Sequence, residues 1–296
     1  MSSTSTAAFH VSNGQIIGPN GQPFKAQGID VLDATLGTIV SDPSGGALLQ
    51  NFPNTNMVRI MLSSYTPDQS VLNTIDWLTA KGIVVQLCNY VNWNSGVPTG
   101  ATLTQETNFF SQMATTYKSN PYVWFNTMNE PQDTYDGLPA GAIDAEHVAV
   151  YNAIRATGNT NMIGLDADGA IQTYDLNPST CLSMSNVFWD DHYYNWLANM
   201  STDLPTNENA LAGEIANVQT MQSADGVMPT IIGEFGNATD GSNIDPGGTQ
   251  AVQAVLDVSQ QFSGWTAFTY LWPASWGGVV GAADQLTNEY TGAMTP

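Results

Sequence analysis

Residues 123–131 read VWFNTMNEP, an apolar run that leads directly into Asn129, Glu130 and Pro131. A short apolar run bounded by polar residues and a proline is typical of a buried strand. The carboxyl group of Glu130 therefore starts in a weakly solvating place, which favours its neutral form and a raised pKa. A carboxyl group with a raised pKa suits a general acid. Taken alone, the pattern fits a solvated glutamate in an ordinary loop equally well.

Outward from this segment, seven other stretches have a similar strand-like character. The eight expected strands are residues 24–30, 56–62, 83–89, 122–127, 161–165, 186–192, 229–234 and 264–271. Between them the clearest expected helices are residues 68–80, 104–118, 139–157, 208–223 and 249–262. Eight strands with mostly helical connections predict a (β/α)8 barrel, the TIM barrel, which typically needs about 250 residues.

Residues 9–24 precede the first of these strands and contain two Asn-Gly pairs, which predict a short N-terminal β-hairpin. An open doubly wound sheet is the alternative to the barrel, but it would normally carry a glycine-rich phosphate-binding turn. Neither GxGxxG nor GxxxxGKS/T occurs in the sequence. No linker, charge run or low-complexity tract divides the chain, so we expect residues 1–296 to form a single domain.

The charge balance is unusual, because 26 residues are acidic and 5 are basic, for a net charge of −21. Charged residues make up 10% of the chain, against about 25% in an average domain. Five basic residues cannot form the positive footprint of a nucleic-acid-binding protein, and they make an anionic membrane an equally poor partner. No apolar run approaches the ~18 residues of a membrane span.

A chain this poor in bases loses most of its net charge around its isoelectric point of 4.1 and avoids the positive self-repulsion of acid denaturation. We interpret it as a protein of an acidic medium outside the cytoplasm, extracellular or periplasmic. A compositional bias of the lineage, without functional content, is the alternative. Residues 1–8 lack the basic and apolar regions of a Sec signal peptide, so none is visible in this chain.

A second carboxyl group ends another expected strand in residues 229–236, PTIIGEFG. A glutamate that forms a salt bridge is the alternative interpretation of Glu234, but the chain has only five basic residues to pair with. Two of its seven glutamates thus end the fourth and seventh expected strands, which face each other across the mouth of a closed barrel. Paired carboxyl groups on either side of a glycosidic bond are the machinery of glycoside hydrolysis.

The two motifs together, VWFNTMNEP and IIGEFG, with Glu234 placed 104 residues after Glu130, resemble glycoside hydrolase family 5. That family belongs to a clan of retaining glycosidases with (β/α)8 barrels. Further segments match it in order, namely NMVRI at 56–60, HYY at 192–194 and YLW at 270–272. The resemblance therefore extends over most of the chain and implies the same fold.

By this resemblance Glu130 is the acid/base and Glu234 the nucleophile. The other implied roles are in substrate binding or support. Asn129 would hold the 2-hydroxyl of the sugar in subsite −1, and Trp272 would form the floor of that subsite. Arg59 would support the nucleophile, Tyr194 would bond to the nucleophile, and His192 would lie near the acid/base or the substrate. Arg59 beside Glu234 would lower the pKa of that carboxyl group and keep it ionised.

The third expected strand departs from the family pattern. Many members end it with Asp-x-His-Asn, whereas this chain has Gln86-Leu87-Cys88-Asn89, so Cys88 replaces the substrate-binding histidine. We expect Asn89 to keep its own binding role and Trp93 to stack on a sugar ring. A nucleophilic role for Cys88 is a poor alternative, since no histidine is near in sequence and a free cysteine is most often buried and inert.

Some polar residues lie outside these motifs. Asp166 and Asp168 resemble a calcium loop only superficially, because the spacing is incomplete, and we expect loop residues near the cleft and no metal site. Asp190 or Asp191 is expected to orient the ring of His192. His147 falls in an expected helix and is interpreted as a solvated or structural residue.

The resemblance implies a retaining endo-β-1,4-glucanase of the cellulase type, because WFxxMNEPxD is more similar to the cellulases than to the mannanases of the family. The stretch from Asn89 to Trp93 is similar to a mannanase loop, so an endo-β-1,4-mannanase is the first alternative. An exo-β-glucosidase and a non-catalytic carbohydrate-binding relative follow. The predicted partner is a neutral polysaccharide, no cofactor is expected, and we expect a monomer.

Overall fold

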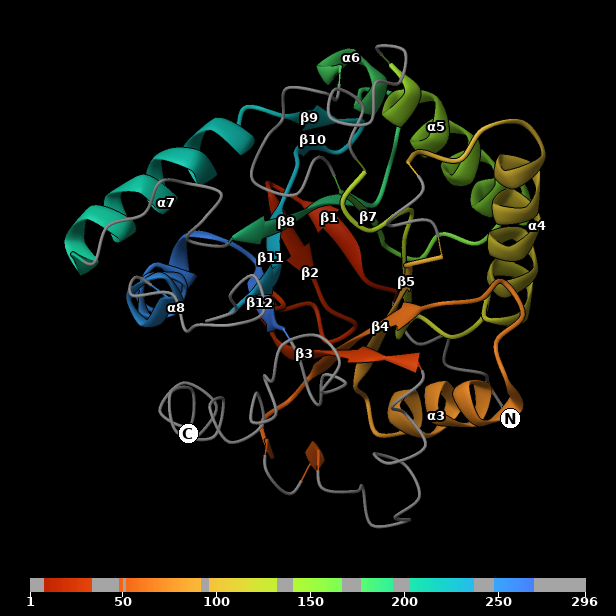
Figure 1. Cartoon of the computed structure of the whole chain (residues 1–296), viewed down its shortest axis with the longest axis horizontal. Coiled ribbons are helices and arrows are strands. Elements are labelled where there is room, and N and C mark those ends of the chain that lie inside the picture. Colours follow the sequence, from red (N-terminus) through yellow and green to blue (C-terminus); the bar gives the residue numbers. More distant parts are fainter. Residues whose placement is uncertain are drawn as a thin grey trace.

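The computed structural model describes residues 8–33, 48–49, 52–91, 96–131, 141–166, 177–193, 203–236 and 248–268. Eight parallel strands close into a barrel in the order β11-β12-β3-β4-β5-β6-β7-β8 (Figure 1). The strands are β3 (Ala26–Leu32), β4 (Met57–Leu62), β5 (Val84–Asn89), β6 (Val123–Asn126), β7 (Ile163–Leu165), β8 (Val187–Tyr193), β11 (Thr230–Phe235) and β12 (Gly264–Ala267). Each strand overlaps one of the eight expected segments, so the prediction of a (β/α)8 barrel is confirmed.

Helices surround the barrel on its outer side (Figure 1). They are α3 (Gln69–Ala80), α4 (Gly100–Thr116), α5 (Ala142–Ala156), the short α6 (Pro178–Cys181), α7 (Leu204–Val218) and α8 (Gly248–Asp257), followed by the 3-10 turn η3 (Ser259–Gln261). In the part of the chain that the structure describes, none of these helices has both the length and the apolar character that crossing a membrane requires.

The boundaries of α7 differ from the sequence-based expectation of 208–223. The helix begins earlier because Asp203 caps it, accepting the backbone N–H of Thr206 at 3.2 Å. It ends at Val218, and the residues that follow form a small antiparallel ribbon of β9 (Gln222–Ser223) and β10 (Gly226–Val227). Gly226, the first residue of β10, has a φ of +97°, a conformation that a helix cannot contain.

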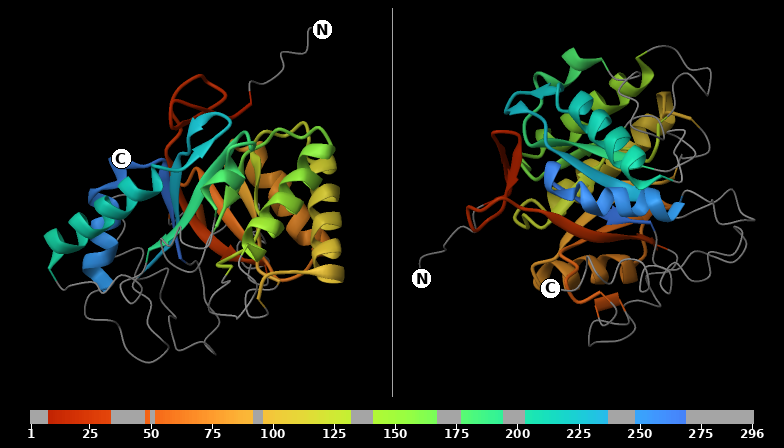
Figure 2. Two further views of the ribbon diagram at one scale, coloured as in Figure 1. Left: turned by 90° about the horizontal axis from the view of Figure 1, so that it is seen from above. Right: turned by 90° about the vertical axis from the view of Figure 1, so that its left-hand side faces the viewer.

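The predicted N-terminal hairpin is confirmed and closes one end of the barrel (Figure 2). Its strands β1 (His10–Ser12) and β2 (Gln15–Ile17) are joined at Asn13 and Gly14, which both have positive φ as a two-residue type I′ turn requires. The hairpin buries apolar side chains against the inner layer of the barrel. That shared cluster contains Phe9, Val11, Ile16, Ala26, Met57, Val84, Trp124, Met162, Phe188 and Ile231.

Side chains alternate along each strand, so one set points out to the helices and the other into the barrel. The outward set is apolar and forms the main core with the helices. The inward set is apolar near the hairpin and changes to polar toward the carboxyl ends of the strands. These buried polar residues are Asp30, Arg59, Gln86, Asn126, Asp190 and His192. A polar layer at this end is the usual place of the active site in the fold.

Candidate active site

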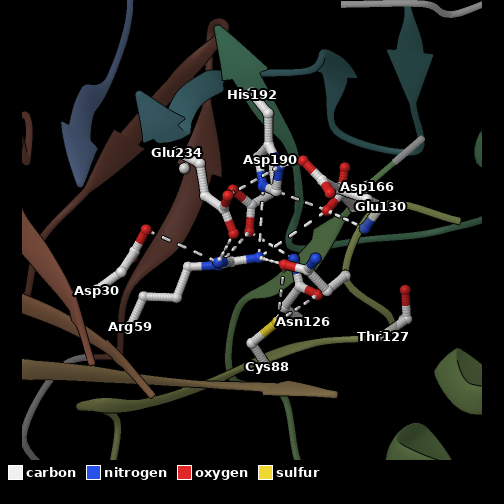
Figure 3. Close-up of polar contacts among 12 residues, drawn as sticks. Asp30, Arg59, Cys88, Asn126, Thr127, Glu130, Asp166, Asp190, His192 and Glu234 are labelled. Carbon is white, nitrogen blue, oxygen red and sulfur yellow. Dashed lines mark hydrogen bonds and ion pairs between the residues drawn. The ribbon is translucent and has the colours of Figure 1, made fainter. Parts of the chain in front are cut away.

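Arg59 lies at the centre of the polar side chains inside the barrel (Figure 3). It projects from β4 and is fully buried. Its Nη1 donates to Oε1 of Glu234 at 2.7 Å, and its Nη2 donates to Oδ1 of Asn129, also at 2.7 Å. Hydrogen bonds from a charged guanidinium are strong and directional, so Arg59 fixes the positions of both partners.

Glu234 reaches this group through an irregularity in β11. Ile231 belongs to the inner layer and Ile232 to the outer core, so strict alternation would turn Glu234 outward. The register of β11 against β8 shifts between Ile232 and Glu234, which leaves Gly233 as an extra residue. A bulge of this kind re-aims the side chain that follows it. Glu234 therefore faces the barrel interior and is 4% exposed.

The pKa of Glu234 differs from the expected direction. Burial raises the pKa of this carboxyl group above its ordinary value, and the interactions with His192 and with the charge of Arg59 oppose the rise without reversing it. The prediction that Arg59 depresses this pKa is therefore wrong in its net direction. The physical reason is that the positive charge of Arg59 is shared between Glu234 and other carboxyl groups. Three further carboxyl groups lie within 4 Å of its guanidinium, those of Asp30, Asp166 and Asp190.

Glu130 follows β6 in a conformation that non-glycine residues rarely adopt, with a φ of +44°. Its backbone N–H donates to Oδ2 of Asp166 at 3.0 Å, and its Oε1 lies 2.8 Å from Nδ1 of His192. Burial raises the pKa of Glu130 to about 7, against the opposing charge of Arg59. The carboxyl group thus has the raised pKa that the apolar strand before it predicts.

His192 stands between the two glutamates. Its Nδ1 lies 2.8 Å from Glu130 and 3.6 Å from Glu234, while its Nε2 lies 3.4 Å from Oδ2 of Asp166. Burial lowers the pKa of His192 to about 4, so the ring is neutral through most of the pH range. We expected Asp190 or Asp191 to orient this ring. The carboxyl group at its second nitrogen is instead that of Asp166.

Asn129 and Cys88 complete the cluster. Because a guanidinium only donates, Oδ1 of Asn129 must face Arg59, which fixes the orientation of the amide. The thiol of Cys88 points to the oxygens of Asn126 at 3.4 Å and Asn129 at 3.8 Å. Burial raises the pKa of Cys88 well above its ordinary value, so the thiol stays neutral. A neutral, fully buried thiol acts as a packing and hydrogen-bonding group, which agrees with a nucleophilic Cys88 being a poor alternative.

Asn89 lies one position further along β5 and therefore points away from the cluster. Its Nδ2 donates to Oε1 of Glu106 on α4, and its backbone carbonyl accepts the N–H of Asn129 at 2.8 Å. The side chain is fully buried on the helix side of the strand. Asn89 thus contacts the cluster through its backbone and not through the amide that the sequence analysis assigned to substrate.

Asp190 forms a second layer beneath Arg59. Its Oδ2 accepts from Nδ2 of Asn126 at 2.5 Å and from Nε2 of Gln86. Gly164 and Gly233 make room for this carboxyl group, since a Cβ atom at position 233 would lie 1.7 Å from Oδ1 of Asp190. Glycine at position 233 is therefore needed twice, for the bulge and for the space that Asp190 occupies.

The barrel interior holds more carboxyl groups than it can ionise. Burial raises the pKa values of Asp30 and Asp166 well above the ordinary range, in spite of the nearby charge of Arg59. One cation cannot compensate this number of buried carboxylates, so protonation is the less costly state for some of them. Some of these buried carboxyl groups are therefore protonated and out of contact with solvent.

The three groups Glu130, His192 and Glu234 offer ligand atoms within 4.8 Å of one another, and among the described residues they form the one cluster with this geometry. Two carboxylates and an imidazole are ligands that a transition metal accepts. Their oxygens and nitrogens already bond to each other and to Arg59, however, and the guanidinium would repel a cation. The arrangement suits acid–base chemistry better than metal binding.

The structure brings together five of the expected site residues, namely Arg59, Asn129, Glu130, His192 and Glu234 (Figure 3). Trp93, Tyr194 and Trp272 lie outside the described residues, so their predicted roles stay predictions. Sequence reasoning did not single out Asp30, Gln86 or Asn126. The signal that points to them is a polar residue within an apolar run: Asp30 stands between Ile29 and Val31, Gln86 between Val85 and Leu87, and Asn126 directly after Phe125.

Residues 20–272 match the family model described as cellulase (glycosyl hydrolase family 5). The chain belongs to glycosyl hydrolase family 5. The resemblance noted from the two glutamate motifs is thereby confirmed, and the matched region includes both motifs and the whole barrel.

Two curated endoglucanases match about half of the chain. Endoglucanase EG-II of Hypocrea jecorina is 28% identical over 147 residues, 46% of this chain and 35% of the relative. The manganese dependent endoglucanase Eg5A of Phanerodontia chrysosporium is 31% identical over 144 residues, 47% of this chain and 33% of the relative. The matched stretch thus spans about a third of the length of these relatives.

Solved structures share the fold at lower identity. The catalytic domain of an endoglucanase from Thermobifida fusca, in complex with cellotetraose, superposes with a TM-score of 0.69 at 17% identity, covering 98% of both chains. The catalytic domain of a mannanase from Streptomyces sp. SirexAA-E superposes with a TM-score of 0.63 at 21% identity, covering 93% of this chain and 85% of the other. At these identities the likeness concerns the fold.

Proposed function

We propose that this family 5 protein is a retaining endo-β-1,4-glucanase that cuts internal bonds of a neutral polysaccharide. The observation that carries the proposal is the pairing of Glu130 with Glu234, since one carboxyl oxygen of each lies within 4.8 Å of the other. A separation near 5 Å is the one used for double displacement, whereas inverting enzymes need a wider gap for a water molecule. The two curated endoglucanases support cellulose-type substrates.

In the first step Glu234 attacks the anomeric carbon while Glu130 donates its proton to the departing glycosidic oxygen. A covalent glycosyl–enzyme ester forms at Glu234, and the leaving chain carries the proton away. In the second step Glu130, now ionised, takes a proton from water, which attacks the same carbon and releases Glu234. The pKa of Glu130 at about 7 suits a group that must both give and take a proton.

The surrounding residues have defined tasks in this scheme. Arg59 orients Glu234 and draws negative charge onto the oxygen that does not attack. Asn129, with its Oδ1 held by Arg59, presents its Nδ2 to the 2-hydroxyl of the sugar. Neutral His192 bonds to Glu130 and keeps its carboxyl group aimed at the leaving oxygen.

An endo-β-1,4-mannanase is the second candidate. It is favoured by Cys88, which places a small neutral side chain where many family members have a substrate-binding histidine, and by the fold likeness to a mannanase.

Trp93, Tyr194 and Trp272 are proposed to complete the sugar subsite. A single catalytic domain acting as a monomer, in an acidic extracellular or periplasmic medium, remains part of the proposal.

The test is hydrolysis of carboxymethyl-cellulose, mixed-linkage glucan, glucomannan and galactomannan between pH 3 and 7, with products sized and the first-formed anomer identified by proton NMR. Ladders of oligosaccharides with the β-anomer first are expected, on glucans before galactomannan. Glu234→Ala should abolish turnover, and Glu208→Gln on α7, outside the site, should not change it. Full hydrolysis by Glu234→Ala, or an α-anomer as first product, would overturn the assignment.

A further inference from the structure

A second set of buried ionisable groups lies behind the acid/base segment, between the barrel and two helices. Glu106 comes from α4, and Glu146 and His147 come from the adjacent α5 (Figure 1). All three side chains are fully buried. Buried ionisable groups cost stability unless they are paired and hydrogen-bonded, and the proposed catalytic steps use none of these three.

The ring of His147 connects the ends of two barrel strands. Its Nε2 lies 2.7 Å from the backbone carbonyl of Asp166, which follows β7. Its Nδ1 lies 2.7 Å from the hydroxyl of Thr127, which follows β6, and 2.5 Å from Oε2 of Glu146. Because a carbonyl oxygen only accepts, Nε2 must carry a proton and donate it to Asp166.

Both strand ends that His147 connects determine where Glu130 lies. Thr127 is three residues before Glu130, and the carboxyl group of Asp166 accepts the N–H of Glu130 at 3.0 Å. Glu130 has a φ of +44°, which persists in a non-glycine residue only when the surroundings hold it. The two anchors that hold this segment from the helix side thus converge on one imidazole.

The three ionisable groups affect one another's pKa values. Burial and the charge of Glu146 raise the pKa of Glu106 to about 10, against the hydrogen bond from Asn89, so Glu106 is neutral. Burial lowers the pKa of His147. The charge and hydrogen bond of Glu146, the backbone carbonyl of Asp166 and the charge of Asp144 raise it by more, so the pKa lies above its ordinary value. Glu146 therefore influences both of its buried neighbours, raising the pKa of Glu106 and that of His147.

We propose that His147, in contact with Glu146, is a positioning residue that sets the location of the acid/base Glu130 through Thr127 and Asp166. The inference rests on the proposed function of Glu130 and adds a task to α4 and α5 that the two-carboxylate scheme does not contain. His147 touches no reacting atom and acts entirely through the strand ends.

Three variants separate positioning from a purely structural role. His147→Leu removes both ring contacts, His147→Gln keeps an N–H donor for the Asp166 carbonyl, and Ile154→Ala is the control. Ile154 is fully buried two turns further along α5, about 10 Å from His147 along the helix axis. Its truncation should lower the melting temperature and leave kcat unchanged.

We expect His147→Leu to lower kcat by about 10- to 100-fold with a smaller change in KM, because a displacement of about 1 Å at an acid/base costs that much. His147→Gln should recover most of kcat. The basic limb of the kcat/KM profile, which reports the acid in the free enzyme, should move to lower pH in His147→Leu only. Equal melting temperatures and equal kcat in His147→Leu and Ile154→Ala would overturn the inference.

A readout without substrate keeps this inference distinct from the proposed function. The chain has seven glutamates, so carbon-13 NMR of labelled glutamate, assigned with Glu130→Gln, can follow the Glu130 carboxyl group directly. Its titration should move from about 7 toward the ordinary range in His147→Leu. If the wild type hydrolyses no glycan, the proposed function fails, while an unchanged Glu130 titration in His147→Leu would reject the positioning role by itself.

Discussion

Arg59 donates a hydrogen bond of 2.7 Å to Glu234 inside the barrel, yet the pKa of Glu234 is raised and not lowered. The pair shows that contact with a cation does not by itself keep a carboxyl group ionised. Loss of water acts on every buried carboxyl group, while the charge of Arg59 is divided among the four that surround it. The balance between burial and the shared charge of Arg59 therefore helps to set the pH at which the proposed nucleophile ionises.

Removal of the guanidinium should thus act mainly on the acidic limb of activity. In Arg59→Met we expect kcat/KM at pH 6 to fall by about 100-fold or more, as for loss of one electrostatic donor in an active site. The acidic limb should move to higher pH because the pKa of Glu234 rises further. Arg59→Lys should recover part of the activity, since the charge is kept and the fork geometry is lost. An acidic limb that does not move in Arg59→Met would contradict the role of Arg59.

Stability should decrease as the pH rises from about 4.5 toward 8. A carboxyl group whose pKa is higher in the folded than in the unfolded state stabilises the fold below its unfolded pKa, and this stabilisation is lost as pH rises through the folded pKa. The carboxyl groups inside the described fold with raised pKa values are those of Asp30, Glu106, Glu130, Asp166 and Glu234. His192 opposes them, because its lowered pKa costs stability as pH falls from 6.5 to about 4.

Each such group contributes at most about 1.4 kcal/mol per pH unit, and the carboxyl groups outnumber His192. Among the described residues no ion pair joins a lysine to a carboxylate, and Lys118 donates to the carbonyl of Thr157 instead, so acid breaks few surface contacts. Urea unfolding from pH 3 to 9 should give the highest free energy of unfolding near pH 4 to 5. A maximum of the free energy of unfolding above pH 7, or an activity optimum there, would contradict the acidic-medium hypothesis.

Gly233→Ala should damage both the fold and the site. The new Cβ would lie 1.7 Å from Oδ1 of Asp190, so either Asp190 or the bulge must move. We expect a loss of about 2 kcal/mol or more in the free energy of unfolding and a clear fall in kcat. Gly213→Ala is the matched control, because a Cβ there meets nothing within 4 Å in the middle of α7. It should stabilise the protein by about 0.5–1 kcal/mol. Equal effects of the two substitutions would be inconsistent with the bulge geometry.

Cys88 and Cys181 should be unreactive in the native protein. Both are free and fully buried, and burial raises both pKa values, that of Cys181 to about 12. A thiol without thiolate character does not attack a disulfide reagent. Titration with a chromogenic disulfide should find no fast thiol in the native state and two after unfolding in guanidinium chloride. A fast-reacting thiol in the native protein, lost in Cys88→Ser, would show that the barrel interior opens at this position.

The positions of the strands could be predicted because their apolar runs end abruptly in polar residues. Residues 123–131 and 229–236 carry that signal most clearly, and it suffices to place Glu130 and Glu234 at the same end of a barrel. The exact ends of α7 could not be predicted, because they depend on the Asp203 cap and on the β9–β10 ribbon that follows the helix. His147 was interpreted only as solvated or structural, because its partners Thr127 and Asp166 are distant in sequence.

The sequence by itself determined the barrel and the two carboxyl groups, since hydrophobic periodicity and the residues at strand ends are local properties of the chain. Only the tertiary structure decided that Glu234 faces inward, because the Gly233 bulge reverses the alternation of β11. It also decided the net direction of the pKa of Glu234 and the direction of the Asn89 side chain. These properties depend on how many groups share one buried charge and on which side of a strand a residue lies, and both are set by contacts between strands.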